Sequence, residues 1–368
     1  MNNISTIEGN IEKRSYKFTH KLKLYKIPFR QAMEQMNKQF LYKFPNGENI
    51  AISVWTTPKR TKTPPWPRVY ETLAYSGKKI TIIPVQASYG LDGDHNIIQP
   101  NTISWITAIA DIYVIIGVYT NASKTAKGPP PANINPQKKS TQGEPVFANF
   151  KFDLNDIENQ ITEIIENNPK VNDWNLLQIR KIPELLSMSI KHNKRLGKKL
   201  GVNVQNFSQA EKKLVAWKNN HDEFLAEFDK RSAEAQNREY NSSQKLENVP
   251  GNKGKVEINV QHFPKLHLTA DSMEVNENEK IITLLEGKNS TKETFPPPGM
   301  VLEQLVKFMV FKNCDFQINE DVYQKRLICY VTGTGKPSTV EIKAKYQDII
   351  DECNANGIEF RFNKKNIK

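Results

Sequence analysis

The sequence predicts an α/β protein in which a mixed sheet flanked by helices is followed by a helical segment and a C-terminal α+β domain. Two apolar runs, at residues 80–85 and 112–119, are dense enough to be strands buried on both faces. Residues 102–110 between them have the composition of an apolar helix. Because a helical crossover joins parallel strands, we expect the two runs to be parallel neighbours.

The first third of the chain supplies the other predicted elements of this sheet. Residues 1–14 have no apolar pattern and are expected to fray, whereas residues 17–26 alternate like a strand. A helix is expected over residues 28–40, because Pro28 opens a segment whose apolar residues follow helical spacing. Residues 50–55 and 69–73 are predicted to be extended.

The middle of the chain is expected to be helical. One helix is predicted over residues 176–200, bent or restarted at Pro183, and Ser208 with Glu211 has the pattern of a capping box that opens the next helix. Prolines and polar residues in the preceding segment cannot form a core element. We therefore divide the chain into an α/β core at 1–125, a linker at 126–153, a basic helical segment at 154–250 that packs on the core, and a C-terminal α+β domain at 255–368.

The C-terminal domain alternates strand-like and helical runs. A helix ending at Asn356-Gly357 is followed by a last strand, because Gly commonly ends a helix in the left-handed conformation. The predicted strands are 256–260, 265–269, 281–285, 326–332, 339–343 and 358–362, and the predicted helices are 300–311 and 346–354.

Composition restricts the function classes. The net charge is +12, with the basic excess in the first two thirds of the chain. Basic surfaces attract phosphate backbones through counterion release, so we expect double-stranded DNA as a partner; the alternative is a basic pI that reflects only solubility. The three cysteines have neither metal spacing nor a disulfide framework, which favours a cytoplasmic protein. No apolar run approaches the ~20 residues that span a bilayer, so no membrane partner is expected.

Two basic clusters are candidates for DNA contact. One lies in and beside a proline-rich loop with a tryptophan, and its alternative interpretation is an ordinary surface turn. The other has helical spacings of three and four, and its alternative is a solvated helix face. The candidate DNA-binding residues are Lys59, Arg60, Lys62, Trp66, Arg68, Lys194, Arg195, Lys198 and Lys199.

Asp92 and Asp94 are the acidic residues that follow the strand at 80–85. They do not open an EF-hand, because the positions that require Gly and Glu are Ile97 and Ile103. A local Asp/Gly turn and metal ligation both remain open. The glycine-rich segment at 332–336 lacks P-loop spacing, and the histidines form no zinc pattern.

The predicted order of helix, three strands, helix and strand is similar to the core of the PD-(D/E)XK nuclease superfamily. Over about residues 50–180 the chain resembles a bacterial group of type II restriction-endonuclease-like proteins. The resemblance is carried by Pro67-Arg-Val-Tyr-Glu-Thr-Leu73, Lys79-Ile-Thr-Ile-Ile-Pro-Val85, Gly90-Leu-Asp-Gly-Asp94, Asn101-Thr-Ile-Ser-Trp105 and the run at 112–119.

The resemblance implies a metal site built from carboxylates. In this superfamily a carboxylate on the second strand and an acidic-x-Lys pair on the third hold magnesium and a water. Glu71 corresponds to the second-strand carboxylate, and Glu34 on the preceding helix is a candidate accessory acid. The third strand departs from the pattern, because it continues into Gln86-Ala-Ser-Tyr-Gly90 without the acids or the lysine. Asp92 and Asp94 are then the local replacements.

The function expected from this resemblance is a DNA-binding, Mg²⁺-dependent endodeoxyribonuclease of a restriction or defence system. Glu71, Asp92 and Asp94 would hold the metal, with Glu34 in support. Palindromic cleavage usually requires a two-fold arrangement, so a homodimer is expected. The alternative is a catalytically inactive DNA-binding or assembly partner of such a system, which the missing third-strand lysine favours.

Overall fold

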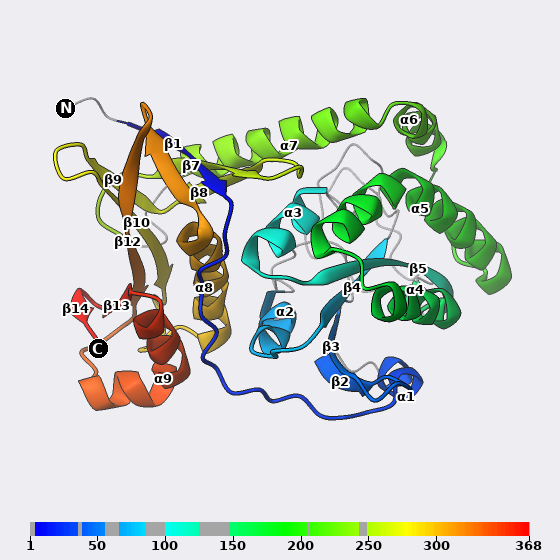
Figure 1. The fold of residues 1–368 in the computed structure, drawn as a ribbon, viewed down its shortest axis with the longest axis horizontal. Coiled ribbons are helices and arrows are strands. Elements are labelled where there is room, and N and C mark those ends of the chain that lie inside the picture. Colours follow the sequence, from blue (N-terminus) through cyan, green and yellow to red (C-terminus); the bar gives the residue numbers. More distant parts are fainter. Residues whose placement is uncertain are drawn as a thin grey trace.

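The computed structural model describes residues 4–35, 39–55, 66–85, 100–124, 147–204, 206–242 and 249–367, without the side chains of residues 66–68. In these residues the chain forms two mixed sheets with helices packed against them, so the predicted mixed α/β class is confirmed (Figure 1). Among the described helices, none combines the length and the apolar character needed to cross a bilayer.

The first sheet has the strand order β2-β3-β4-β5-β6. Its middle strands β3 (Asn49–Val54), β4 (Lys79–Val85) and β5 (Tyr113–Lys124) are parallel, and β2 (Gln39–Lys43) and β6 (Phe147–Phe152) add antiparallel edges. Helix α3 (Pro100–Ile109) connects β4 to β5, so the predicted crossover between parallel strands is confirmed. Continuous apolar sequence produces this arrangement, because both faces of β4 and β5 are covered.

Helices cover this sheet with buried faces. Helix α4 (Leu154–Asn167) buries its isoleucine stripe, and the predicted helical character of residues 154–240 is confirmed. Helix α5 (Val171–Leu200) runs through Pro183 and packs along β5. The side-chain oxygens of Asn175 and Gln178 accept hydrogen bonds from the Val114 and Ile116 amides at 2.8 and 3.3 Å, which fixes the helix on the strand.

Several predictions of local structure in the first part of the chain are wrong. Residues 69–73 lie in helix α2 (Trp66–Leu73), because Val69, Tyr70 and Leu73 form one buried helical face. Helix α1 (Phe29–Glu34) ends before Phe40, which pairs with Ile52 in the β2–β3 hairpin. Residues 17–26 form no strand ladder, with one isolated bridge at Lys26.

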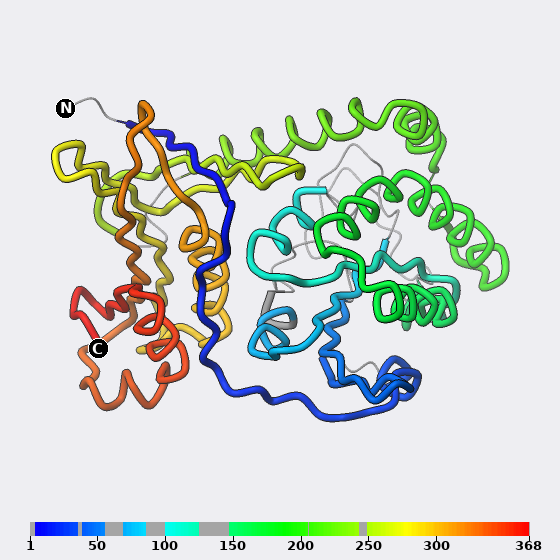
Figure 2. The backbone as a smooth tube through the Cα atoms, viewed as in Figure 1, coloured from blue at the N-terminus to red at the C-terminus, as the bar shows by residue number. Residues whose placement is uncertain are grey.

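The second sheet contains the chain's N-terminus. Strand β1 (Thr6–Ile11), expected to fray, pairs in parallel with β7 (Gly254–Val260) and antiparallel with β11 (Asp315–Ile318). Its Gly9 permits a close approach, since a Cβ there would lie 2.3 Å from Cys314 Sγ. The segment after β1 crosses from the second sheet to the first (Figure 2), so the predicted core range 1–125 contributes to both sheets.

The rest of the second sheet is C-terminal. Strands β8 (Leu266–Ala270), β9 (Ser272–Asn276), β10 (Ile281–Asn289), β12 (Asp321–Thr332), β13 (Ile358–Phe362) and β14 (Lys365–Asn366) complete it. Helix α8 (Pro298–Asn313) joins β10 to β11, and α9 (Thr339–Ala355) joins β12 to β13. The predicted strand at 339–343 is wrong, because Ser338 and Glu341 form a capping box that begins α9 there.

Two further helices connect the sheets. Helix α6 (Ser208–Asn219) leads into α7 (His221–Asn241), which lies along the second sheet. The capping box predicted at Ser208 and Glu211 is wrong, because the N-cap residue is Phe207 and it makes no side-chain cap. Asn313, at the end of α8, donates to the carbonyls of Ala108 and Ile109 in the α3 region, so the second sheet's helix is hydrogen-bonded to the first unit.

Candidate functional site

The structure separates the acidic residues expected to share a metal. Glu71 lies on helix α2 instead of on a strand, where it lines a pocket formed with residues of α8 and α9. Glu34 lies on α1 and is exposed. Asp92 and Asp94 lie outside the described residues. The expected second-strand position of Glu71 is therefore wrong, because the segment that carries it is helical.

The expected DNA-contacting residues fall into three groups. Lys59, Arg60 and Lys62 lie outside the described residues, and the backbone of Trp66 and Arg68 lies in the first turn of α2. The cluster on α5 is described completely. Its four members are exposed on the last two turns of the helix: Lys194, Arg195, Lys198 and Lys199.

Half of this α5 cluster is engaged within the protein. Lys194 pairs with Glu211 at 2.7 Å, and Arg195 donates a hydrogen bond to the carbonyl of Thr120 at 2.8 Å. Lys198 and Lys199 extend this surface at the C-terminal end of the helix, where positive charge complements the helix dipole. The arrangement is compatible with both predicted interpretations, phosphate contact and a solvated face.

A different set of charged residues converges on the second sheet. Strands β8 and β9 are separated by Asp271 alone, so they form one extended segment with a bend at the carboxylate. Strand β10 runs antiparallel to β9 and parallel to β12, and α8 follows β10 in the chain. This topology places Asp271 beside residues near the end of β10.

Asp271 and Glu286 are neighbours across the two strands. In the register, Ser272 lies opposite Leu285, and the Gly287 amide donates a hydrogen bond to Asp271 Oδ2 at 2.8 Å. The backbone of β10 thereby orients the aspartate. Asp271, at the bend, and Glu286, on β10, are consequently held near each other by the pairing of β9 with β10.

Strand β10 and helix α8 exchange two ion pairs. Glu286 and Lys288 are two residues apart, so they project from the same face of the strand. Lys307 and Glu303 are one helical turn apart on α8. Glu286 pairs with Lys307 at 2.8 Å, and Lys288 pairs with Glu303 at 3.9 Å. The sequence Glu286-Gly-Lys288 is therefore matched by residues of opposite charge on the helix.

The inner pair of Glu286 and Lys307 is buried close to further acidic side chains. The side chains of Glu286 and Lys307 are only 6% and 13% exposed. Burial, opposed by Lys307 and reinforced by Asp271 and Glu239, raises the pKa of Glu286 to about 8. Burial lowers the pKa of Lys307, but the three carboxylates outweigh that effect and raise it.

Asp271 and Glu286 are the two acids of this site that could act as ligands of a metal ion. Within the described ranges, no group of three or more His, Cys, Asp or Glu side chains is arranged to hold a metal ion. A magnesium site needs fewer protein ligands than such a group, since the ion is commonly held by one or two carboxylates together with waters and substrate phosphates. Asp271, at the bend between β8 and β9, and Glu286, on β10, supply two such carboxyl groups.

Sequence reasoning missed this site although a local signal was present. The predicted strand at 281–285 leads directly into Glu286-Gly-Lys288, and the predicted strand at 265–269 is followed by Asp271. The resemblance, however, directs the search for an acidic-x-Lys pair to the end of the strand at 80–85. The sequence could not indicate Glu303 and Lys307 of α8 as partners of this pair, because their proximity to β10 is a tertiary contact.

Comparison with known proteins gives no family. No family model matches the chain, and searches of curated proteins and of solved structures also return no match. The resemblance to PD-(D/E)XK nucleases therefore stays a prediction.

Proposed function

We propose that the chain is a Mg²⁺-dependent endodeoxyribonuclease of a restriction or defence system, with a metal site at Asp271 and Glu286. The observation that carries the proposal is the Glu286-x-Lys288 pair, with its buried acid, beside Asp271. The acidic-x-Lys pattern expected of a PD-(D/E)XK nuclease and absent after residues 80–85 is present here. Glu71 then has no part in metal binding.

The element order supports this assignment. Helix α7, strand β7, the bent β8–β9 segment, strand β10, helix α8 and strand β12 follow one another in the chain, with the short β11 hairpin arm before β12. This order resembles the helix, three strands, helix and strand of the superfamily. Asp271 corresponds to the second-strand carboxylate, and Glu286 and Lys288 correspond to the third-strand pair.

Each residue has a role that follows from its contacts. Magnesium, when bound, lowers the pKa of a water and neutralises charge on the scissile phosphate. Asp271 is oriented by the Gly287 amide, and Lys307 holds the carboxylate of Glu286 in place. Lys288 is only loosely paired with Glu303, at 3.9 Å, so its ammonium is able to contact a substrate phosphate.

The partners expected from the sequence are part of the same proposal. The basic excess of residues 1–255 and the exposed lysines of α5 support contact with double-stranded DNA. The proposal also includes a homodimer and a cytoplasmic location. All three cysteines are free and buried in the structure, which is compatible with a reducing compartment.

Cleavage of a DNA library of random sequence with magnesium tests the proposal. Wild type is expected to cut, Asp271→Asn to lose at least about 100-fold in rate, and Glu71→Gln to cut at the wild-type rate. Asp271→Asn keeps the size of the side chain and its acceptor for the Gly287 amide. Unchanged cleavage by Asp271→Asn, or loss confined to Glu71→Gln, would remove the assignment.

One observation favours a second candidate, a catalytically inactive DNA-binding or assembly partner. The Lys307 ammonium already lies 2.8 Å from Glu286, where it occupies the carboxyl group that a metal would use. In that case the protein binds DNA with a steep salt dependence but without any dependence on magnesium. Binding measured in EDTA and in MgCl₂ distinguishes the two functions.

A further inference from the structure

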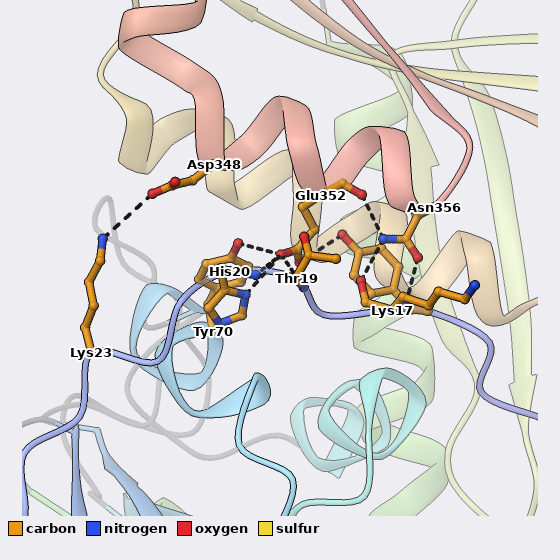
Figure 3. A network of polar contacts seen from close by, with 9 residues as sticks. Lys17, Thr19, His20, Lys23, Tyr70, Asp348, Glu352 and Asn356 are labelled. Carbon is orange, nitrogen blue, oxygen red and sulfur yellow. Dashed lines mark hydrogen bonds and ion pairs between the residues drawn. The ribbon is translucent and has the colours of Figure 1, made fainter. Parts of the chain in front are cut away.

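A second polar site lies where the segment after β1 crosses between the sheets, and Figure 3 shows its network of polar contacts. A pocket of about 310 Å³ is lined by residues of this segment, of α2, of the N-terminal part of α8 and of the middle of α9. The pocket includes His20, Tyr70, Leu302 and Lys345. None of the residues assigned to the metal site lines it, so the inference is independent of the proposed nuclease function.

The pocket lies next to a buried carboxylate. Glu352, on α9, is fully buried and accepts hydrogen bonds from side chains and from the backbone. The hydroxyls of Tyr16 and Tyr70 donate to it at 3.2 and 3.1 Å, and the amides of Thr19 and His20 donate at 3.2 Å. A carboxylate with these contacts acts as an acceptor only, which is the behaviour of the ionised form.

His20 is the positive partner for this buried anion. Its Nδ1 lies 3.0 Å from Glu352 Oε2, and its ring stacks on Tyr70 with 4.0 Å between the ring centroids. Among the residues that the structure places in hydrogen-bond contact with Glu352, His20 is the one able to carry positive charge. Because a buried charge needs a compensating charge, the imidazolium form is favoured.

The other nitrogen of His20 has no partner among the described residues. The side chain is 5% exposed, and Nε2 is a buried polar atom to which no described group is hydrogen-bonded. In the imidazolium this nitrogen is an N–H donor, and leaving a buried donor unpaired is costly. Since His20 lines the pocket, a ligand there would supply the missing acceptor.

The pocket walls favour a negatively charged acceptor. Within the described part of the chain, Lys21 and Lys345 line the pocket without an ion pair, whereas Lys23 pairs with Asp348 at 3.8 Å. Pro298 and Leu302 of α8 contribute an apolar part of the wall. Glu71 also lines the pocket, and its negative charge opposes the binding of an anion.

We propose that this pocket binds the phosphate of a phosphate monoester, with His20 Nε2–H, Lys21 and Lys345 as donors. The size suits a mononucleotide-sized group. A free nucleotide and the phosphorylated 5′ end of a DNA strand present the same chemistry. Glu352 is a positioning residue, because it holds His20 through Nδ1 and makes no contact with the ligand.

The hydroxyls of Tyr16 and Tyr70 help to hold the Glu352 carboxylate that positions His20. Burial, and then Glu352, raise the pKa values of Tyr16 and Tyr70, so both hydroxyls keep donating to Glu352. The titratable groups that face His20 and the pocket are Tyr16, Lys21, Lys23, Tyr70, Glu71, Lys345, Tyr346, Asp348, Glu352 and Cys353.

Isothermal titration calorimetry of the full chain tests the proposal. The probes are inorganic phosphate, deoxyadenosine 5′-monophosphate, and a DNA duplex with either a 5′-phosphate or a 5′-hydroxyl. His20→Asn is expected to weaken phosphate binding by about tenfold or more at pH 6, since one hydrogen bond to a charged group is lost. His262→Asn is the matched control, because His262 is exposed and has a positive φ that Asn tolerates.

A rim variant keeps the test valid if His20→Asn unfolds. Lys345 is exposed on α9, and Lys345→Gln is expected to weaken phosphate binding about two- to fivefold, while Lys343→Gln on the same helix leaves it unchanged. Tighter binding of the 5′-phosphate duplex than of its 5′-hydroxyl twin identifies a DNA end, and binding of the mononucleotide alone identifies a free nucleotide. Undetectable phosphate binding, or equal affinity in wild type and Lys345→Gln, overturns the proposal.

Discussion

Replacing Glu286 with glutamine should change how stability depends on pH. The carboxyl has an ordinary pKa of 4.5, and burial raises it to about 8 in the folded protein. Between these pH values the native state holds one more proton than the unfolded state, so the free energy of unfolding falls as pH rises. The contribution is complete below about pH 4.5 and is lost as pH rises through about 8.

The size of this effect follows from the same two pKa values. Their difference corresponds to roughly 5 kcal/mol of differential stability, as an upper magnitude. The amide of the Glu286→Gln variant does not titrate, so the stability of wild type relative to that variant should fall by several kcal/mol between pH 5 and pH 8.5. The raised pKa of Lys307 does not alter the sign, because Lys307 stays protonated throughout this window.

Urea unfolding followed by tryptophan fluorescence, in EDTA at pH 5, 6, 7 and 8.5, measures the difference. Glu277→Gln is the control, because Glu277 is exposed in the turn before β10. A difference that rises with pH would refute the reasoning, because it would mean that Lys307 holds Glu286 ionised. A flat difference would show that the buried carboxyl does not titrate in this range.

The remaining predictions concern other parts of the molecule. Glu352→Gln places an amide against the hydroxyl and amide donors around it and should cost about 3–5 kcal/mol of unfolding free energy in urea, whereas exposed Asp348→Asn should stay within about 0.5 kcal/mol. Gly333→Ala should lower the free energy of unfolding by about 1–3 kcal/mol in thermal unfolding, because its Cβ would lie 1.9 Å from the Thr294 carbonyl oxygen. Gly299→Ala in α8 should raise the free energy of unfolding by about 0.5–1 kcal/mol, because a Cβ there meets no described atom within 4 Å. Changing Lys198 and Lys199 together to Gln should reduce the salt slope of DNA binding by about 1.8 in fluorescence anisotropy, while Lys336→Gln on an exposed loop should leave it unchanged; equal slopes would exclude α5 from the interface.

The parts of the fold that were predictable have strong local patterns. Strands β4 and β5 are nearly continuous apolar runs, and α3 between them leaves parallel pairing as the natural connection. The isoleucine stripe of α4 has the periodicity of a helix with one buried face. In these segments local sequence and tertiary burial favour the same structure.

The wrong predictions lie where distant partners decide the structure. Strand β1 forms because β7 and β11, near the other end of the chain, flank it, and nothing in residues 6–11 alone indicates them. The short segment at 69–73 is compatible with a strand or a helix until its buried face is known.

The candidate site shows the same limit. The sequence contains the acid and the lysine of Glu286-x-Lys288, but their neighbours Asp271, Glu303 and Lys307 come from other elements. Burial of Glu286, which gives it an unusual pKa, is a property of the packed sheet and helix. Local motifs alone therefore cannot decide whether the acids after residues 80–85 or those at Asp271 and Glu286 form the better candidate metal site.

Anomalous diffraction from crystals soaked in Mn²⁺, a magnesium substitute with a usable signal, tests the position of the metal site most directly. We predict a peak in contact with carboxylate oxygens of Asp271 and Glu286, and its loss in Glu286→Gln crystals. A peak beside Glu71, or no peak with saturating Mn²⁺, would contradict the assignment of the second sheet as the metal-binding unit.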